Sequence, residues 1–236
     1  MLTDHVGSAF FDGNSVMRAL GRFAFPIYAF LIAEGFYHIR DNPGKVRKHF
    51  LRLMILTVIS EIPYDLMETG KLFDWSSQSV MLTLLVGMAG LMITERFRDF
   101  PAFIGFFYAV AAAITYFAMP NYKLTGVLMI FFYYWFVNHC RDYPVLKKYL
   151  ILTAFSIVYL PLYNWVRYGF PELGTLVART LRGWSWLVPY IGINLLFSLY
   201  KGKNGYKSKA LNMCYAYFYP AHMLIIAALM FLTGKY

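Results

Sequence analysis

The chain has 236 residues, of which 59% are hydrophobic, 20% aromatic and only 14% charged. An average soluble domain is about a quarter charged, so this composition excludes an ordinary soluble protein and favours a membrane protein, as does the positive mean hydropathy. The two cysteines have no metal-ligand spacing and form no disulfide framework, so we expect no metal site.

Apolar runs of about 20 residues, long enough to cross roughly 30 Å of hydrocarbon, predict eight membrane-spanning helices. They cover residues 21–39, 49–67, 79–94, 100–119, 122–138, 148–165, 184–200 and 210–233. Residues 1–11 are apolar but too short to cross, which is typical of the end of a longer helix or of a helix in the membrane interface. Short connections and the lack of a visible repeat predict one domain over residues 1–236. The predicted fold is all-α, a polytopic transmembrane bundle of about eight to nine helices.

The net charge of +10 would also suit a nucleic-acid-binding protein, but the basic residues are concentrated in alternate connections. The richer connections contain Arg40, Lys45, Arg47, Lys48 and Arg52, then Arg96 and Arg98, then Arg141, Lys147 and Lys148, and finally Lys201, Lys203, Lys207 and Lys209. This alternation is the positive-inside pattern of membrane proteins. It places residues 41–48 and 201–209 in the cytoplasm, and residues 68–78 and the carboxy terminus outside. We therefore expect the lipid bilayer, and no nucleic acid, as a partner.

Ionisable side chains lie inside the predicted spans, where a charge costs a few kcal/mol and usually faces a protein interior or a wet cavity. Glu34 lies in the first span, Glu61 and Asp65 lie in the second, and His222 lies in the last. Their number predicts a polar site inside the bundle.

Each of these residues also has a simpler explanation. Glu34 fits a buried ion pair and Asp65 an interfacial position, while His222 fits a histidine bonded to backbone opened by Pro220. Arg52 fits a topology anchor at a helix end. The prediction of a polar site therefore depends on the set of charges and not on any one residue.

Two classes of protein remain open at this point. A small-solute transporter would place its site at broken helices near the midplane, and Pro26, Pro63 and Pro220 would provide the breaks, but the expected inverted repeat is not visible. A membrane enzyme needs a base, for which histidine is suited. Basic residues at one mouth would suit a phosphate-bearing donor.

Several ordered motifs resemble the TraX family, which is named for the pilin N-acetylase of conjugative plasmids. They are Leu2-Thr3-Asp4-His5-Val6-Gly7, Gly21-Arg22-Phe23-Ala24-Phe25-Pro26, Glu34-Gly35, Arg52-Leu53, Ile59-Ser60-Glu61-Ile62-Pro63-Tyr64-Asp65, Thr83-Leu84-Leu85-Val86-Gly87 and Tyr217-Phe218-Tyr219-Pro220-Ala221-His222. The amino-terminal third carries most of the resemblance, and the middle of the chain is only hydrophobic. The family usually has more apolar residues before the Asp-His pair, and an asparagine is common where Ser79 stands.

The resemblance implies an enzyme of the bacterial cytoplasmic membrane that moves an acetyl group from acetyl-CoA to an amine or hydroxyl acceptor, either a pilin-like protein or a surface glycan. The catalytic residues would be His5, as base or acetyl carrier, with Asp4 and Glu61, and we expect Glu61 to orient His5. The expected substrate-binding residues are Arg22, Glu34, Arg52, Lys48, Asp65 and His222. Lys48 and Arg52 would bind the phosphates of the donor at the cytoplasmic mouth, and Glu34 would hold an arginine or His38.

Overall fold

The computed structural model describes residues 1–11, 15–75, 78–118, 123–167, 172–182, 187–202 and 208–235, and all regular secondary structure in these residues is helical. The helices are α1 (Leu2–Phe10), α2 (Ser15–Gly21), α3 (Ala24–Ile39), α4 (Pro43–Thr69), α5 (Val80–Arg96), α6 (Pro101–Ala118), α7 (Lys123–His139), α8 (Val145–Arg167), α9 (Leu173–Arg182), α10 (Leu187–Leu199) and α11 (Lys209–Leu232). The prediction of an all-α fold is confirmed.

The eight predicted segments correspond to α3 to α8, α10 and α11, and α1 is the short helix expected at the start. The described residues also form α2 and α9, which the sequence did not predict because they are too short to give long apolar runs. Helix α4 begins earlier than predicted because the Asn42 side chain accepts a hydrogen bond from the Lys45 amide at 3.0 Å, with Pro43 as the first helical residue. The predicted boundaries at 119, 122 and 184 lie outside the described residues, as do Lys203 and Lys207.

The prolines do not break the helices, which corrects one expectation. Pro26 lies in the first turn of α3, while α4 continues through Pro63 and α11 continues through Pro220. A proline in a helix removes one backbone hydrogen bond, and packing against neighbouring helices can compensate for that loss. Helices α4 and α11 lie side by side along much of their length, which provides such packing.

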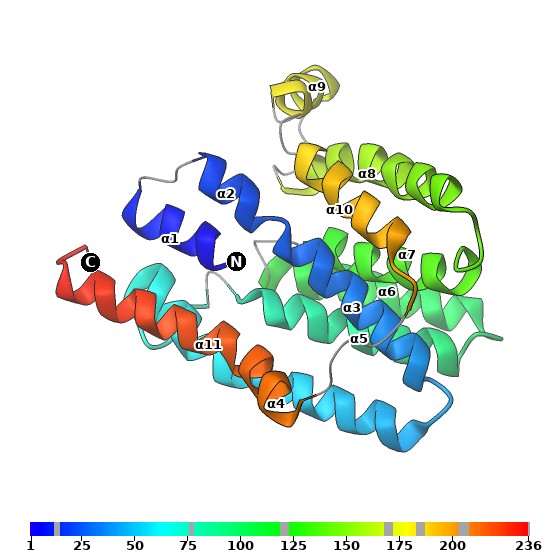
Figure 1. The fold of residues 1–236 in the computed structure, drawn as a ribbon, viewed down its shortest axis with the longest axis horizontal. Helices are drawn as coiled ribbons and strands as arrows, with labels where there is room; N and C mark the ends of the chain where they lie inside the picture. Colours follow the sequence, from blue (N-terminus) through cyan, green and yellow to red (C-terminus); the bar gives the residue numbers. More distant parts are fainter. Residues whose placement is uncertain are drawn as a thin grey trace.

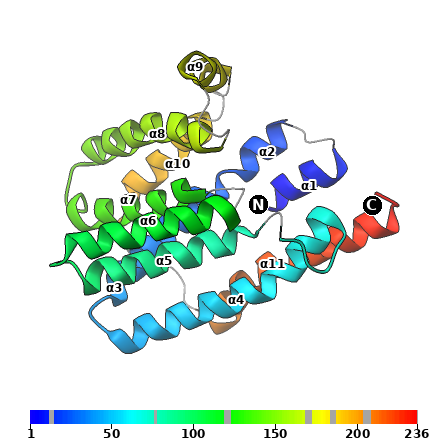
Figure 2. The same ribbon diagram turned by 180° about the vertical axis from the view of Figure 1, so that it is seen from behind.

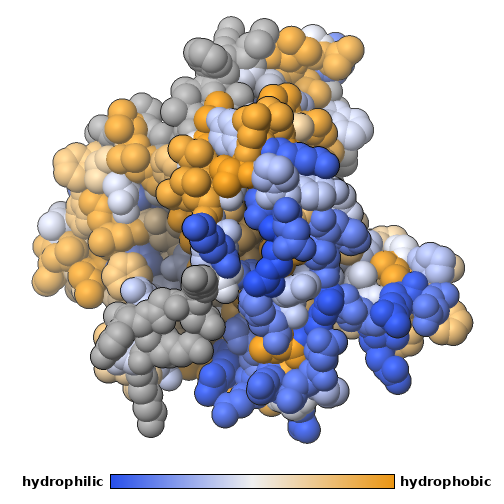
Figure 3. Space-filling model, turned by 45° about the vertical axis from the view of Figure 1, so that its right-hand side comes forward, coloured by the Kyte–Doolittle hydropathy of each residue, from blue (hydrophilic) through white to orange (hydrophobic). Residues whose placement is uncertain are grey.

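The remaining helices form a second group around α3, which packs against α7 and α5 and also touches α10 (Figures 1 and 2). The α1–α2 hairpin lies against α11, and α9 projects from the bundle beside α8. Helices α3, α5, α7 and α10 end at one side of the molecule, where α4, α6 and α8 begin (Figure 1). Hydrophilic side chains gather at this end beside a largely hydrophobic flank (Figure 3).

Two of the described helices are long and apolar enough to cross a membrane, over Val145–Val166 and Met213–Leu232. Shorter apolar segments occupy Ala24–Ile39, Pro101–Ala113, Leu124–His139 and Tyr190–Leu199. Crossing of a membrane stays a prediction for all of the predicted spans.

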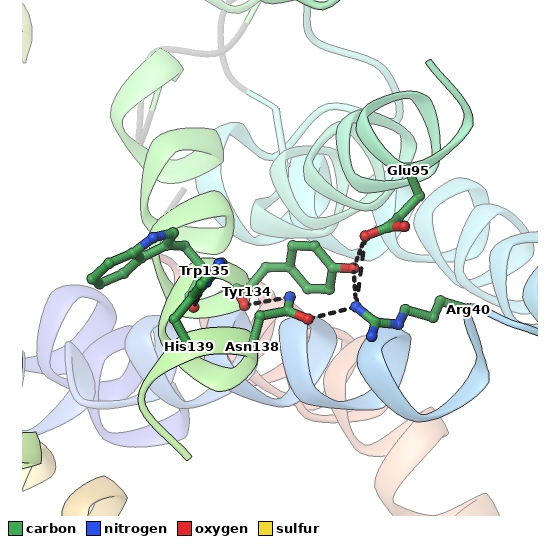
Figure 4. A network of polar contacts seen from close by, with 6 residues as sticks. All are labelled: Arg40, Glu95, Tyr134, Trp135, Asn138 and His139. Carbon is green, nitrogen blue, oxygen red and sulfur yellow. Dashed lines mark hydrogen bonds and ion pairs between the residues drawn. The ribbon is translucent and has the colours of Figure 1, made fainter. Parts of the chain in front are cut away.

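A polar network joins the ends of three helices (Figure 4). Arg40, just after α3, donates to the Tyr134 hydroxyl at 3.0 Å and to the Asn138 side-chain oxygen on α7, and its guanidinium lies 3.7 Å from the Glu95 carboxylate on α5. Tyr134 also donates to Glu95. Arg40 is therefore a link between α3, α5 and α7 as well as part of a basic loop.

Candidate functional site

A cavity of about 90 Å³ lies where the α1–α2 hairpin meets α3, α4, α5 and α8, and we call it the His5 pocket. Its lining consists of Met1, Asp4, His5, Ser8, Arg18, Gly21, Arg22, Phe25, Tyr64, Glu68, Val80 and Tyr163. Three of the predicted site residues, Asp4, His5 and Arg22, therefore lie together.

The hairpin depends on a very close approach of α1 and α2 at Gly21. A Cβ atom added at Gly21 would overlap the Asp4 Cβ atom and would lie 2.7 Å from both the Asp4 Cα and N atoms. Atoms at such distances repel strongly, and two of these three belong to the backbone. The absence of a side chain at Gly21 is therefore what lets Asp4 and His5 reach the pocket.

Asp4 and His5 have different partners, although they are adjacent in the sequence. The Asp4 carboxylate lies 3.5 Å from Nε of Arg18 on α2, forming an ion pair. The His5 ring faces the ring of His222 on α11, with 5.6 Å between the ring centroids. Successive residues on a helix point about 100° apart, which explains why the two side chains diverge.

His222 is buried, with only 4% of its surface exposed, and its orientation is set by its own helix. Its Nδ1 lies 2.7 Å from the Phe218 carbonyl oxygen, which can only accept, so we assign the proton to Nδ1. In the neutral ring, Nε2 is then an acceptor, and it has no hydrogen-bond partner among the described residues. His222 thus packs against His5 and also bonds to the backbone of its own helix.

Burial lowers the pKa of His5 to about 3, and the nearby His222, the amino terminus and Arg18 add to the effect. His5 is therefore neutral near pH 7 and has a lone pair available for a proton. Arg22 places a positive charge in the same cavity, and Glu68 on α4 places a negative charge there. This arrangement could take a proton from an acceptor and stabilise a developing oxyanion.

Glu61 and Asp65, the two predicted carboxylates of α4, bind to the segment that precedes α5. Glu61 accepts hydrogen bonds from the Ser79 amide at 3.2 Å and from the Ser79 hydroxyl at 2.6 Å. Asp65, 4% exposed, accepts from the Asp74 amide at 3.0 Å. Glu61 is absent from the lining of the His5 pocket, so the expectation that it orients His5 gains no support from this geometry.

Glu34 lies in a different cavity, of about 320 Å³, at the other end of α3. This cavity, the Arg141 pocket, is lined by Phe30, Glu34, Phe136, Val137, Arg141, Asp142, Val145, Lys148, Phe197, Ser198, Leu199, Tyr200, Lys201 and Gly202. Glu34 lies 3.5 Å from the His38 ring, as expected. Lys48 and Arg52 are exposed on α4 and line neither pocket.

The predicted site residues did not include the other polar side chains of the His5 pocket, which are Ser8, Arg18, Tyr64, Glu68 and Tyr163. A signal existed for Arg18, because it lies four residues before Arg22, and for Glu68, which lies four residues after Tyr64 in a motif-bearing helix. Tyr163 gave no such signal because it lies in a purely hydrophobic part of the sequence.

An all-helical protein with apolar helices and a buried histidine pocket fits the class of membrane-associated helical proteins. The chain matches the model of the family described as TraX protein over residues 1–230, and it belongs to that family. It is also similar to the probable fimbrial assembly protein FimC, serogroup H1, of Dichelobacter nodosus, with 27% identity over 247 residues that cover 98% of this chain and 92% of that protein. No solved structure matches the chain.

Proposed function

We propose that this protein is an integral membrane acetyltransferase that moves an acetyl group from acetyl-CoA to an amine or hydroxyl acceptor. The observation that carries the proposal is the placement of the Asp4-His5 motif in a cavity with Arg22 and Glu68. Membership of the TraX family supports acetylation of a pilin. The name of the similar fimbrial assembly protein favours a pilin-like protein over a surface glycan as the acceptor.

The proposed location is the bacterial cytoplasmic membrane, crossed several times. Large apolar side chains are exposed along α4, α8 and α11, including Ile55, Val58, Ile157, Val158 and Ile225. Extended apolar surface of this kind is costly in water and is typical of contact with a partner or a membrane. Lipid is the occupant that also explains the two long apolar helices.

In the proposed reaction, the acceptor nitrogen or oxygen attacks the carbonyl carbon of the thioester while neutral His5 takes its proton. The tetrahedral intermediate carries negative charge on oxygen, and Arg22 can stabilise that charge. When the carbon–sulfur bond breaks, the thiolate of coenzyme A leaves and takes the proton from His5. Glu68 can hold the acceptor amine, and the Asp4–Arg18 ion pair fixes the start of α1.

The remaining predicted residues have supporting roles in this proposal. His222 positions the His5 ring by packing against it. Glu61 and Asp65 position α4 and the start of α5, which supply Tyr64, Glu68 and Val80 to the pocket.

The test is acetyl transfer by the purified protein in lipid nanodiscs. We expect acetyl-CoA to release free thiol faster in the presence of a pilin-derived peptide with a free amino terminus, and this peptide to become acetylated. A blocked peptide that lacks lysine and hydroxyl side chains should not be acetylated and should leave thiol release at the slow rate of hydrolysis. His5→Ala should lower kcat by roughly 10²–10⁴-fold, the usual contribution of a general base. His139→Ala is the matched control, because His139 is exposed at the end of α7. Equal turnover by His5→Ala and His139→Ala would remove His5 from the mechanism.

A further inference from the structure

The Arg141 pocket lies at the hydrophilic end of the bundle, at the opposite end of α3 from the His5 pocket. The positive-inside pattern predicts that this end faces the cytoplasm. Its volume of about 320 Å³ is at the lower end of the range of small-molecule sites, which runs from about 300 to 1,000 Å³. The cavity is therefore large enough for part of a soluble ligand that comes from the cytoplasm.

The charges of this pocket favour an anion. Arg141, Lys148 and Lys201 line it together with two acids, Glu34 and Asp142. Glu34 already has partners in the protein, because it lies 3.5 Å from the His38 ring and accepts a hydrogen bond from the Tyr200 hydroxyl. Three cations thus face two carboxylates, so the lining has an excess of positive charge.

The connection after α10 passes directly over Arg141 at Gly202. Gly202 has a φ of +67°, a left-handed conformation that favours glycine. An added Cβ atom would lie 2.7 Å from Nη2 of Arg141 and 3.7 Å from Oε1 of Glu34. The missing side chain therefore lets the backbone of this connection pass in close contact with the guanidinium and helps to hold Arg141 at the pocket.

Aromatic rings form the inner wall of the same cavity. Phe30 stacks on Phe197 with 4.2 Å between centroids, and Tyr200 meets the edge of Phe30 at 5.8 Å. Tyr200 is also partly open to solvent. A flat, polarisable ring could stack here while its charged substituents reach the cations.

We propose that the Arg141 pocket binds the nucleotide end of the acyl donor, with Arg141, Lys148 and Lys201 on its phosphate groups and the aromatic wall beside its base. The inference rests on the proposed function for the identity of the donor. It differs from the sequence-based expectation, which placed the phosphates at Lys48 and Arg52.

A row of aromatic rings in consecutive contact extends from the Arg141 pocket to the His5 pocket. Neighbouring centroids are 5.5 to 6.2 Å apart along Phe197, Tyr133, Phe155, Tyr159 and Tyr163. Tyr163 lines the His5 pocket and Phe197 lines the Arg141 pocket.

The length of α3 sets the span that the donor must cover. Phe25 lines one pocket and Glu34 the other, and nine residues of helix correspond to about 14 Å. A long, narrow pantetheine arm could cover such a distance between a nucleotide in one pocket and a thioester in the other.

The first test measures binding of adenosine 3′,5′-bisphosphate, which has the phosphates and base of the donor's nucleotide end but no thioester. Calorimetry on the full chain in a neutral detergent should detect binding that weakens at least tenfold in Arg141→Ala/Lys148→Ala. The matched control is Arg96→Ala/Arg98→Ala, which removes two exposed cations at the same end of the bundle. Equal affinities in wild type and both double variants, or no binding at all, would overturn the proposal.

A lipid headgroup is the other possible source of phosphate in this pocket. Vesicles of phosphatidylglycerol should compete weakly with the nucleotide, and adenosine without phosphate should bind poorly. If phosphatidylglycerol displaces the nucleotide completely and binds only when Arg141 is present, the pocket is a lipid site and the proposal is wrong.

Activity assays separate a failure of this inference from a failure of the proposed function. Arg141→Ala should raise KM for acetyl-CoA at least tenfold, and it should raise KM much less for N-acetylcysteamine thioester, a donor without a nucleotide. Normal KM for acetyl-CoA in Arg141→Ala would refute the inference and leave the acetyltransferase intact. Arg141-dependent nucleotide binding without acetyl transfer from either donor would support the inference as a nucleotide site and refute the proposed reaction.

Discussion

The two pockets on α3 differ in size, in chemistry and in the part of the sequence that forms them. The His5 pocket is small and contains a neutral imidazole and paired charges, and residues of the recognisable motifs build half of its lining. The Arg141 pocket has more than three times the volume, and it is mostly built by α7, α8, α10 and the connections that follow α7 and α10, where the sequence has no motif. The comparison suggests that reactive groups are visible in a single sequence, whereas a binding cavity assembled from several hydrophobic helices is not.

The largest effect should come from Gly21→Ala, which we expect to abolish turnover. The new Cβ atom would collide with the backbone of Asp4 and force α1 away from α2, at a cost of roughly 1–3 kcal/mol in stability. Nucleotide binding at the Arg141 pocket should not change. Gly35→Ala is the control, because nothing lies within 4 Å of its added Cβ atom. Thermal unfolding and thiol release measure both effects, and an active Gly21→Ala would contradict this account of the hairpin.

Arg40→Ala should weaken the end of the bundle that contains the Arg141 pocket. Loss of its bonds to Tyr134 and Asn138 should lower the free energy of unfolding by roughly 1–3 kcal/mol. Chemical denaturation in detergent can measure this change against Arg98→Ala, an exposed loop residue. Equal stabilities of the two variants would mean that the network in Figure 4 contributes little.

The two glutamates should respond differently to loss of charge. Glu34→Gln removes a negative charge beside the proposed phosphate site, and a gain of about 1 kcal/mol would tighten nucleotide binding roughly fivefold. Glu61→Gln should leave this affinity unchanged but reduce turnover, because the amide cannot accept both hydrogen bonds from Ser79. For both variants, calorimetry measures the affinity for the nucleotide and thiol release measures turnover on the same preparations. Weaker nucleotide binding in a folded Glu34→Gln would contradict the assignment of charges.

The pH dependence of kcat/KM should show no loss of activity due to His5 between pH 8 and pH 5. The pKa of His5 lies near 3, so its neutral form, which accepts the proton, is present throughout this range. Slow hydrolysis of acetyl-CoA is the suitable reaction, because an amine acceptor would itself titrate. A decline centred near the unperturbed histidine pKa of about 6.5 would show that His5 is not desolvated in the working enzyme.

The smallest effect is expected for Lys48→Ala/Arg52→Ala. Both side chains are exposed on α4 and lie outside the lining of the Arg141 pocket, so KM for acetyl-CoA should stay within about twofold of wild type. A tenfold rise in KM for acetyl-CoA would favour the sequence-based prediction that Lys48 and Arg52 bind the donor phosphates. Orientation in the membrane must be checked in the same experiment, because loss of basic residues can change topology.

The sequence predicted the all-helical fold well because long apolar runs and capping residues act locally. The run that became α8 was recognised without knowledge of the rest of the molecule. The Asn42-Pro43 start of α4 is also specified locally, although the prediction began this helix at residue 49. The family was also identified from short motifs, each made of a few consecutive residues, and the match over residues 1–230 confirms the family.

Side-chain partners could not be predicted in the same way. Asp4 was expected to act beside His5 and Glu61 to orient it, yet Asp4 pairs with Arg18 and Glu61 bonds to Ser79. Adjacent or nearby positions on one helix do not define a contact, because the direction of each side chain depends on which neighbour packs against that face.

By itself, the sequence determined that the long apolar segments are helical, which residues have reactive groups and which basic connections alternate along the chain. Only the tertiary structure decided that His5 meets His222 from the other end of the chain, that Gly21 lets α1 approach α2, and that three cations surround an aromatic cavity. Hydrogen bonds within a helix join residues four apart, so local sequence specifies them. Contacts between helices depend on how apolar surfaces with similar composition pack against one another, and many arrangements of such surfaces have the same linear pattern.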